Sequence, residues 1–291
     1  MVNALFREAE RCALEALIYE VEVTPKPGLV DKNTNGAHSD MNASLFIESA
    51  RVVSERIGKC AGYGYVNADL PYVHAFQGIR RIGLRAEREM LLATGGINTH
   101  KGAIFAFSII ACAYGRLTKN HPSGAKDLLT VLKEAGRLSE ETLLKELIQI
   151  KQRSPATNGE RAYLLNNIEG ARGEAISGFR SIAYIAYPAY MQAKAHGANQ
   201  NDAGVYALLH LIARVNDTCL IARGGMGGLA FAQSAAQTVL KRGGDFIKET
   251  KALDREFTAC RLSPGGSADL LGALKFLLLL TGIDTRGRIS V

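Results

Sequence analysis

The stretch GINTHKGAIFAFSIIACAY (residues 96–114) joins a short polar motif, bounded by glycines, to an almost entirely apolar run. The apolar part, residues 103–114, is shorter than the roughly 20 residues that a membrane-spanning helix needs. The run LLGALKFLLLL (residues 270–280) is equally short and contains Lys275. Both runs therefore predict helices that are buried in a protein core.

Helical periodicity dominates the rest of the chain. The first predicted helix has one apolar face, made of Leu5, Ala9, Cys12, Ala13, Ala16 and Leu17. The same spacing recurs in residues 45–57, 76–92, 128–132, 143–150, 206–213, 229–240 and 270–280. Strict alternation of apolar and polar residues does not persist anywhere. The sequence therefore predicts an all-α fold, a single domain over residues 1–291 with about ten or more helices, judged from typical helix lengths.

Glycines and capping residues mark the expected helix ends. Gly95-Gly96 predicts the end of a helix, and the capping-box pattern of residues 157–160 predicts a start. Ser123 and Ser267 are further candidate N-caps. Residues 117–157 are richer in charged residues and contain a cluster of Gly, Pro and Ser. We expect this segment to be a helical insertion that packs on the main bundle.

Composition narrows the class of protein. Apolar residues make up 47% and charged residues 22%, as in soluble globular proteins. The net charge of +7 fits an anionic partner, but with 7% aromatics and no basic stripe we expect neither nucleic acid nor a membrane. The N-terminus lacks the apolar region of a signal peptide. The five cysteines lack CxxC spacing, which favours a reducing cytoplasm, and Cys12 and Cys112 are expected to be packed core thiols.

The first of five polar motifs is TPKPGLVDKNTNGAHSDM, residues 24–41. Its prolines and glycines exclude a helix, so it predicts an ordered loop. The loop presents charged and titratable side chains in close succession, namely Lys26, Asp31, Lys32, His38 and Asp40. A solvated connector is one interpretation; a functional loop is the other, since long loops inside a compact domain are often functional.

The second motif is GINTHKG, in which Asn98, Thr99, His100 and Lys101 precede a core helix. Free backbone N–H groups and the helix dipole favour an anion there, and a lysine beside them suits a phosphate. The spacing is not that of a Walker loop. Asn98 or Thr99 serving only as an N-cap is the equally reasonable alternative.

The third and fourth motifs also lie at helix starts. GARGEAISGF (residues 170–179) places Arg172 close to Glu174, either as a local ion pair or as part of a site. NDTCLIARGGMGG (residues 216–228) places Asp217 between two apolar helices. A half-buried carboxylate there would need a cation, either a metal or Arg223.

The fifth motif is RLSPGGSADLLGAL, residues 261–274, with Ser263 in a sharp turn. Asp269 either complements the dipole of this last helix or contributes to a site. The five motifs share Gly-rich turns, cationic side chains for anions, and aspartates. Carboxylate oxygens suit Mg²⁺, whose coordination phosphate groups usually complete. The sequence therefore predicts a site for Mg²⁺ and a polyphosphate.

The motifs TPKPGLVD, GAHSDM, GINTHKGAIF, GARGEA, DT followed by RGG, and LSPGGSADLL occur in this order over nearly the whole chain. In this respect the chain resembles the triphosphoribosyl-dephospho-CoA synthases of citrate lyase and malonate decarboxylase systems. It departs from the family where Cys219 follows DT in place of the usual Asn, and where Arg180 follows GF in place of the usual Pro. Residues 117–157 match little.

The resemblance implies an all-α enzyme that uses ATP and dephospho-CoA. The 2′-hydroxyl of dephospho-CoA attacks C1′ of the ATP ribose, and adenine leaves. The product is the prosthetic-group precursor of an acyl-carrier subunit and would pass to a holo-acyl-carrier-protein synthase. Displacement at an anomeric carbon has an oxocarbenium-like transition state and needs a carboxylate base.

These roles are hypotheses for the residues of the motifs. The expected phosphate contacts are Lys26, Lys101, Arg172 and Arg223. The groups expected to orient ribose or phosphate are Asn98, Thr99 and Ser263. The candidates for general base and for Mg²⁺ ligand form one pool, Asp31, Asp40, Asp217 and Asp269, with Glu174 as a further base. The expected Mg²⁺ ligands within it are Asp40, Asp217 and Asp269. His38 and His100 are expected to donate a proton toward adenine or to bind phosphate.

Two other functions compete with this one. The first is a Mg²⁺-dependent hydrolase of ADP-ribosyl or other N-glycosidic bonds, in which water replaces the ribose hydroxyl. The second is a non-catalytic basic adaptor that binds RNA or an acyl-carrier partner. A homodimer is compatible with the sequence, which does not assign the oligomeric state.

Overall fold

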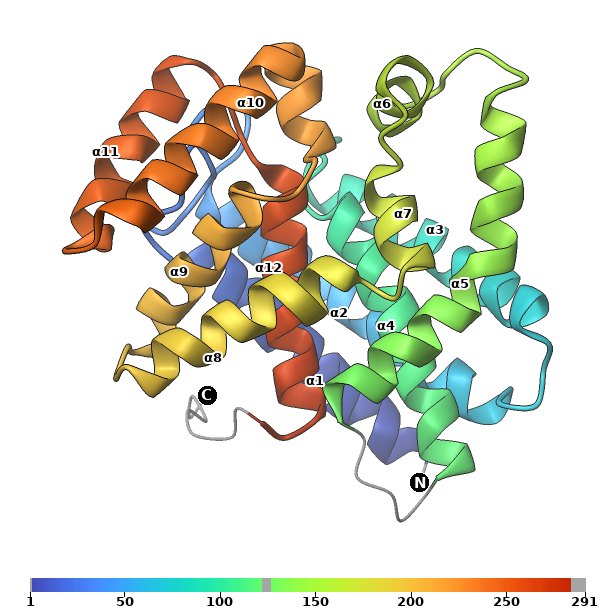
Figure 1. Ribbon diagram of the computed structural model, residues 1–291. Helices are drawn as coiled ribbons and strands as arrows, with labels where there is room; N and C mark the ends of the chain where they lie inside the picture. The colour runs from blue at the N-terminus through green and yellow to red at the C-terminus, as the bar shows by residue number, and fades with distance from the viewer. Residues whose placement is uncertain (1, 122–126, 284–291) are drawn as a thin grey trace.

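The computed structural model describes residues 2–121 and 127–283 and shows a bundle of α-helices around one core (Figure 1). The elements in chain order are α1 (Val2–Glu22), α2 (Ala43–Val66), α3 (Tyr72–Ala93), α4 (Lys101–Asn120), α5 (Leu128–Ile150), α6 (Asn158–Asn166), α7 (Gly170–Ile176), the π-helix η1 (Ile182–Ala186), α8 (Tyr187–Ala195), α9 (Gln200–Ile212), α10 (Thr218–Arg242), α11 (Phe246–Ala259) and α12 (Gly265–Leu280). The described residues contain no strand, so the all-α prediction is confirmed.

The two apolar runs are the centre of the bundle. Helix α12 lies in its middle, between α1, α4 and α9, and nearly all of its residues are buried (Figure 1). Helix α4 packs against it through Phe107 and Phe276, whose rings stack with centroids 4.7 Å apart. Cys12 and Cys112 are buried in the same core, as expected. Among the described helices, none has the length and apolar character that crossing a membrane requires.

Glycines inside helices bring α2 and α4 close together. A Cβ atom on Gly64 would lie 2.2 Å from the carbonyl oxygen of Cys112, and one on Gly115 would lie 2.0 Å from that of Ala61. Only glycine leaves room for two backbones at this separation. Part of the high glycine content therefore serves helix packing, and other glycines, among them Gly102, Gly265 and Gly266, line the cavity described below.

The predicted capping box is confirmed, because Thr157 is the N-cap of α6 and accepts a hydrogen bond from the N–H of Glu160. The prediction for Ser267 was wrong: α12 begins two residues earlier, at Gly265, and the Ser267 hydroxyl bonds to Asp217. Ser123 lies outside the described residues. Within residues 117–157, α5 contributes Val131 and Leu138 to the main core.

Candidate active site

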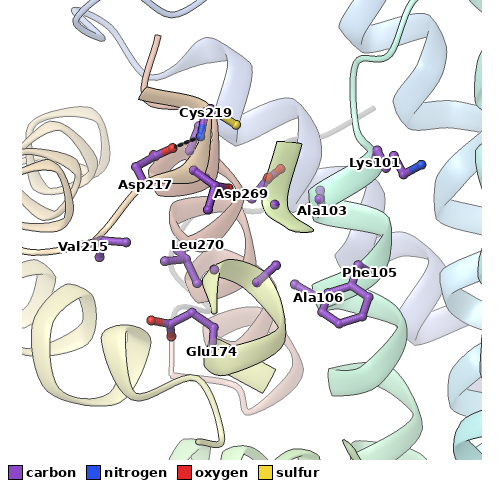
Figure 2. Close-up of a pocket in the computed structure, with 18 of the residues that line it drawn as sticks. Lys101, Ala103, Phe105, Ala106, Glu174, Val215, Asp217, Cys219, Asp269 and Leu270 are labelled. Carbon is purple, nitrogen blue, oxygen red and sulfur yellow. Dashed lines mark hydrogen bonds between the residues drawn. The ribbon is translucent and has the colours of Figure 1, made fainter. Parts of the chain in front are cut away.

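A cavity of about 790 Å³ opens where the polar motifs meet (Figure 2). It lies between α4, α7 and the N-terminal ends of α10 and α12, and the loop before α2 closes one side. Its lining includes ten of the predicted site residues: His38, Asn98, Thr99, His100, Lys101, Glu174, Asp217, Arg223, Ser263 and Asp269. The other four, Lys26, Asp31, Asp40 and Arg172, are not part of this lining.

Asp269 lies at the N-terminus of α4 and not at that of its own helix. The N–H of Ala103 donates a hydrogen bond to its carboxylate, and a Cβ on Gly102 would lie 1.9 Å from Oδ2. Burial raises the pKa of Asp269 well above its ordinary value of 3.8, and the negative charges of Glu20 and Asp217 raise it further. The place that the sequence assigned to a bound anion is therefore taken by a carboxylate of the protein.

Asp217 is the N-cap of α10 and also holds α12 in place. It accepts hydrogen bonds from the N–H groups of Cys219 and Leu220, at 2.8 and 3.4 Å, and from the N–H and Oγ of Ser267, at 2.7 and 2.9 Å. Neutral donors at two helix N-termini thus stabilise its charge, and Arg223 does not pair with it among the described residues. Metal binding at Asp217 stays a prediction.

Lys26 is almost fully buried, with 1% of its side chain exposed, and its Nζ pairs with Glu20. It also donates to the carbonyl oxygen of Glu20 at 2.6 Å. Glu20, which is not among the predicted site residues, lies in the wall of the cavity. A signal was present, because Glu20 falls three residues after Leu17 and four after Ala16, on the apolar face of α1. A charged residue on an apolar face needs a partner, and Lys26 supplies it.

Asp31 fixes the shape of the loop that precedes α2. It accepts hydrogen bonds from Oγ1 of Thr24 at 2.7 Å and from the N–H groups of Lys26, Asn33 and Thr34 at 2.7–3.2 Å. The loop is thus ordered, as predicted. Asp40 lies on the outer side of the loop with 59% of its side chain exposed, 3.6 Å from Nδ1 of His38.

His38, Arg223 and Ser263 form a cationic edge of the cavity. Nε2 of His38 lies 2.9 Å from Oγ of Ser263, and Nη2 of Arg223 lies 3.1 Å from Nδ1 of His38. Nη1 of Arg223 donates to the carbonyl oxygens of Ala37 and Arg261. Burial and the nearby guanidinium lower the pKa of His38. Arg223 is held in place without a carboxylate partner among the described residues, which leaves its charge for a ligand.

Glu174 and Arg172 are neighbours on α7 but face different surroundings. Glu174 lines the cavity and accepts hydrogen bonds from the N–H and Oγ of Ser181, at 3.2 and 2.5 Å. Burial raises its pKa. Arg172 bonds instead to Glu146 at 3.2 Å and Glu160 at 3.4 Å, so the local Arg172–Glu174 ion pair is not formed. The side chains diverge because α7 packs between the cavity and α5.

Residues of the GINTHKG motif both cap α4 and line the cavity. Oδ1 of Asn98 accepts a hydrogen bond from the N–H of Lys101 at 3.1 Å, which is the capping alternative. The Lys101 side chain extends away from the cavity (Figure 2), and its Nζ pairs with Glu87 at 3.1 Å. His100 is buried, and its pKa is lowered to about 3 by burial and by the charge of Lys26.

Comparison with known proteins identifies the family. The family model for ATP:dephospho-CoA triphosphoribosyl transferase matches residues 6–286. The chain belongs to this family. Three relatives carry the name 2-(5''-triphosphoribosyl)-3'-dephosphocoenzyme-A synthase. The protein of Pectobacterium atrosepticum is 41% identical, and the match covers 90% of this chain and 85% of that protein. The protein of Klebsiella pneumoniae is 39% identical, with 95% of this chain and 92% of that protein covered. The protein of Escherichia fergusonii is 37% identical, with 90% of this chain and 87% of that protein covered.

Membership of the transferase family confirms that the chain is an enzyme, and it indicates triphosphoribosyl-dephospho-CoA synthase activity. The adaptor alternative is therefore wrong. Of the two departures noted in the sequence, Cys219 lies in the wall of the cavity, whereas Arg180 does not. A further wall residue, Phe179, is buried with φ of 54°, a conformation that is rare for an aromatic residue. Sequence spacing gave no sign of it.

Proposed function

We propose that the chain transfers the triphosphoribosyl group of ATP to the 2′-hydroxyl of dephospho-CoA within this cavity. The bond between the 2′-oxygen and C1′ forms, the C1′–N9 bond breaks, and adenine leaves. The observation that carries the proposal is the juxtaposition, in one cavity, of two carboxylates with raised pKa values and a cationic edge. The first feature suits proton transfer and cation binding, and the second suits phosphate.

Glu174 is the proposed general base. Its raised pKa brings it closer to neutrality, where a base accepts a proton most effectively, and Ser181 holds it in one orientation. Asp31 and Asp217 are poor alternatives, because each already accepts four hydrogen bonds. Asp40 is exposed and lies outside the lining. Glu174 therefore takes the proton of the 2′-hydroxyl.

Arg223 is the proposed phosphate ligand, supported by His38 and Ser263. Its guanidinium is fixed by two carbonyl oxygens and its charge is not matched by a carboxylate in the described chain. Planar guanidinium groups suit phosphate oxygens. Lys26 and Arg172 lie outside the cavity lining and are already paired with glutamates, so we assign them to the structure of the walls.

Mg²⁺ fits the cavity at Asp269. The described residues contain no cluster of three or more metal-ligating side chains, but Mg²⁺ commonly uses one or two carboxylates and completes its coordination with phosphates and water. Burial, and after it the charges of Glu20 and Asp217, raise the pKa of Asp269, and a bound divalent cation would stabilise its charged form. When bound with ATP, Mg²⁺ would neutralise the triphosphate. Of the three predicted ligands, only Asp269 meets these conditions.

The test is to incubate the protein with ATP, Mg²⁺ and dephospho-CoA and to measure free adenine by chromatography. We expect adenine and the coupled product in equal amounts. Release of ADP or AMP without adenine would contradict the proposal. Release of adenine without any dependence on dephospho-CoA would support the hydrolase alternative.

The biological setting follows from the same proposal. The product would serve as the prosthetic-group precursor for citrate lyase or malonate decarboxylase and pass to a holo-acyl-carrier-protein synthase in the cytoplasm. The genes adjacent to this one identify which of the two systems it serves. Sedimentation of the purified protein distinguishes a monomer from a homodimer.

A further inference from the structure

Three side chains, one from α2 and two from the residues that precede α4, form a chain of hydrogen bonds that ends at His100. Oγ1 of Thr99 donates to Oγ of Ser49 at 2.7 Å, and Oγ of Ser49 lies 2.8 Å from Nδ1 of His100. Ser49 is on α2 and is fully buried, and His100 is 2% exposed. The edge of the His100 ring meets Phe46, with ring centroids 5.0 Å apart. Both rings belong to the lining of the cavity.

The order of donors in this series decides which nitrogen of His100 carries hydrogen. Because Thr99 donates to the oxygen of Ser49, the hydrogen of Ser49 is free to go to Nδ1, and the described residues offer it no other acceptor. Burial keeps the imidazole uncharged at neutral pH. An uncharged imidazole that accepts at Nδ1 has its hydrogen on Nε2. We therefore assign Nε2 as a hydrogen-bond donor.

This donor has no acceptor in residues 2–121 and 127–283, although it is buried. A buried N–H without an acceptor is unfavourable, so the position is suited to a ligand atom. The surrounding lining includes the apolar side chains of Leu17, Met41, Phe46 and Phe105. A single neutral donor on a ring that packs against Phe46 matches a nucleobase ring nitrogen better than a phosphate, which requires cations.

We propose that Nε2 of His100 donates a hydrogen bond to a ring nitrogen of the adenine that leaves ATP, and that Ser49 and Thr99 are the positioning residues. The inference rests on the proposed function. As the C1′–N9 bond breaks, its electron pair moves into the adenine ring, and a donor at N3 or N7 stabilises that charge. The hydroxyl proton of dephospho-CoA goes to Glu174. His100 keeps its hydrogen, adenine takes a proton from water, and Glu174 then releases its proton to the hydroxide that remains.

The first experiment measures the binding of free bases to the wild type and to His100→Ala by calorimetry. The bases are adenine, 3-deazaadenine and 7-deazaadenine, two of which lack one ring acceptor. We expect adenine to bind roughly tenfold more weakly to the variant, as for the loss of one hydrogen bond. One deaza base should bind equally to both proteins. Equal weakening of all three bases, or unchanged adenine binding, would overturn the proposal.

The second experiment tests the positioning residues by kinetics. Ser49→Ala and Thr99→Val should lower kcat for adenine release about threefold to tenfold and leave KM for dephospho-CoA unchanged. His100→Gln, which keeps an N–H donor, should recover part of the adenine binding lost in His100→Ala. The matched control is Ser54→Ala, since Ser54 is also buried on α2 but bonds only to the carbonyl of Arg51.

If Ser49→Ala and Ser54→Ala behave alike, the positioning role is wrong. Failure of the proposed function gives a different result, because the wild type would then release no adenine in the presence of ATP, Mg²⁺ and dephospho-CoA. Base binding is measured without turnover, so the two failures are distinguishable.

Discussion

The N-termini of α4 and α10 each face one aspartate, and the two aspartates differ in their surroundings. Asp217 caps its own helix and accepts hydrogen bonds from four donors. Asp269 reaches α4 from another helix, and its pKa is raised by burial and by neighbouring carboxylates. The hydrogen bonds to Asp217 stabilise its negative charge. The surroundings of Asp269 disfavour its charged form, which a bound cation would stabilise. The difference suggests that Asp217 serves the fold and Asp269 serves the chemistry.

The largest effect is expected for Asp269→Asn, which should lower the rate of adenine release by about 100-fold or more. Removing a metal ligand or a transition-state charge has effects of this size. Steady-state kinetics with saturating Mg²⁺ measures it. The matched control is Asp202→Asn, in the first turn of α9 and outside the cavity lining. A rate within threefold of the wild type would refute the assigned role.

Asp217→Ala should have its main effect on stability. It removes an N-cap and leaves buried N–H groups of two helices without an acceptor, for an expected loss of about 2–4 kcal/mol in the free energy of unfolding. Urea unfolding measures the loss. Asp269→Asn should lose little stability in the same measurement, since it removes a carboxylate whose charged form is disfavoured. Equal losses in both variants would erase the contrast between the two aspartates.

The stability of the protein should depend on pH through Asp269. Folding raises the pKa of Asp269, so the folded state binds a proton more tightly than the unfolded chain. Without Mg²⁺, the wild type should therefore lose stability relative to Asp269→Asn as pH rises from about 4 through the raised pKa. Below that window the difference should vanish. Urea unfolding of the wild type and of Asp269→Asn at pH 4 and pH 8 measures this difference. The same difference in stability at both pH values would contradict the prediction.

The smallest effect is expected for Lys101→Ala. Its side chain is 55% exposed and pairs with Glu87, and exposed pairs contribute about 0–1 kcal/mol. KM for ATP should change less than threefold. Glu87→Gln is the control, because it frees Lys101 without removing it. An increase of tenfold or more in KM would instead support the hypothesis, drawn from the sequence, that Lys101 binds phosphate.

Local sequence patterns predicted most of the long helices, although they did not indicate α8 or α11. Apolar periodicity located α1, α4 and α12, and the capping box located the start of α6. These features depend on residues only a few positions apart, so local spacing predicts them. The order of the motifs further predicted the family, which comparison with known proteins confirmed.

The partners of the charged side chains, by contrast, follow from the packing of distant segments. The tertiary structure placed Asp269 at α4, paired Lys26 with Glu20, and turned Arg172 toward Glu146. Such roles depend on burial and on partners that can lie more than 160 residues away, as Asp269 does from Gly102. The local spacing of residues does not predict these long-range contacts. The GINTHKG motif therefore predicted where the cavity would form, but not that the anion at its helix start is the protein's own carboxylate.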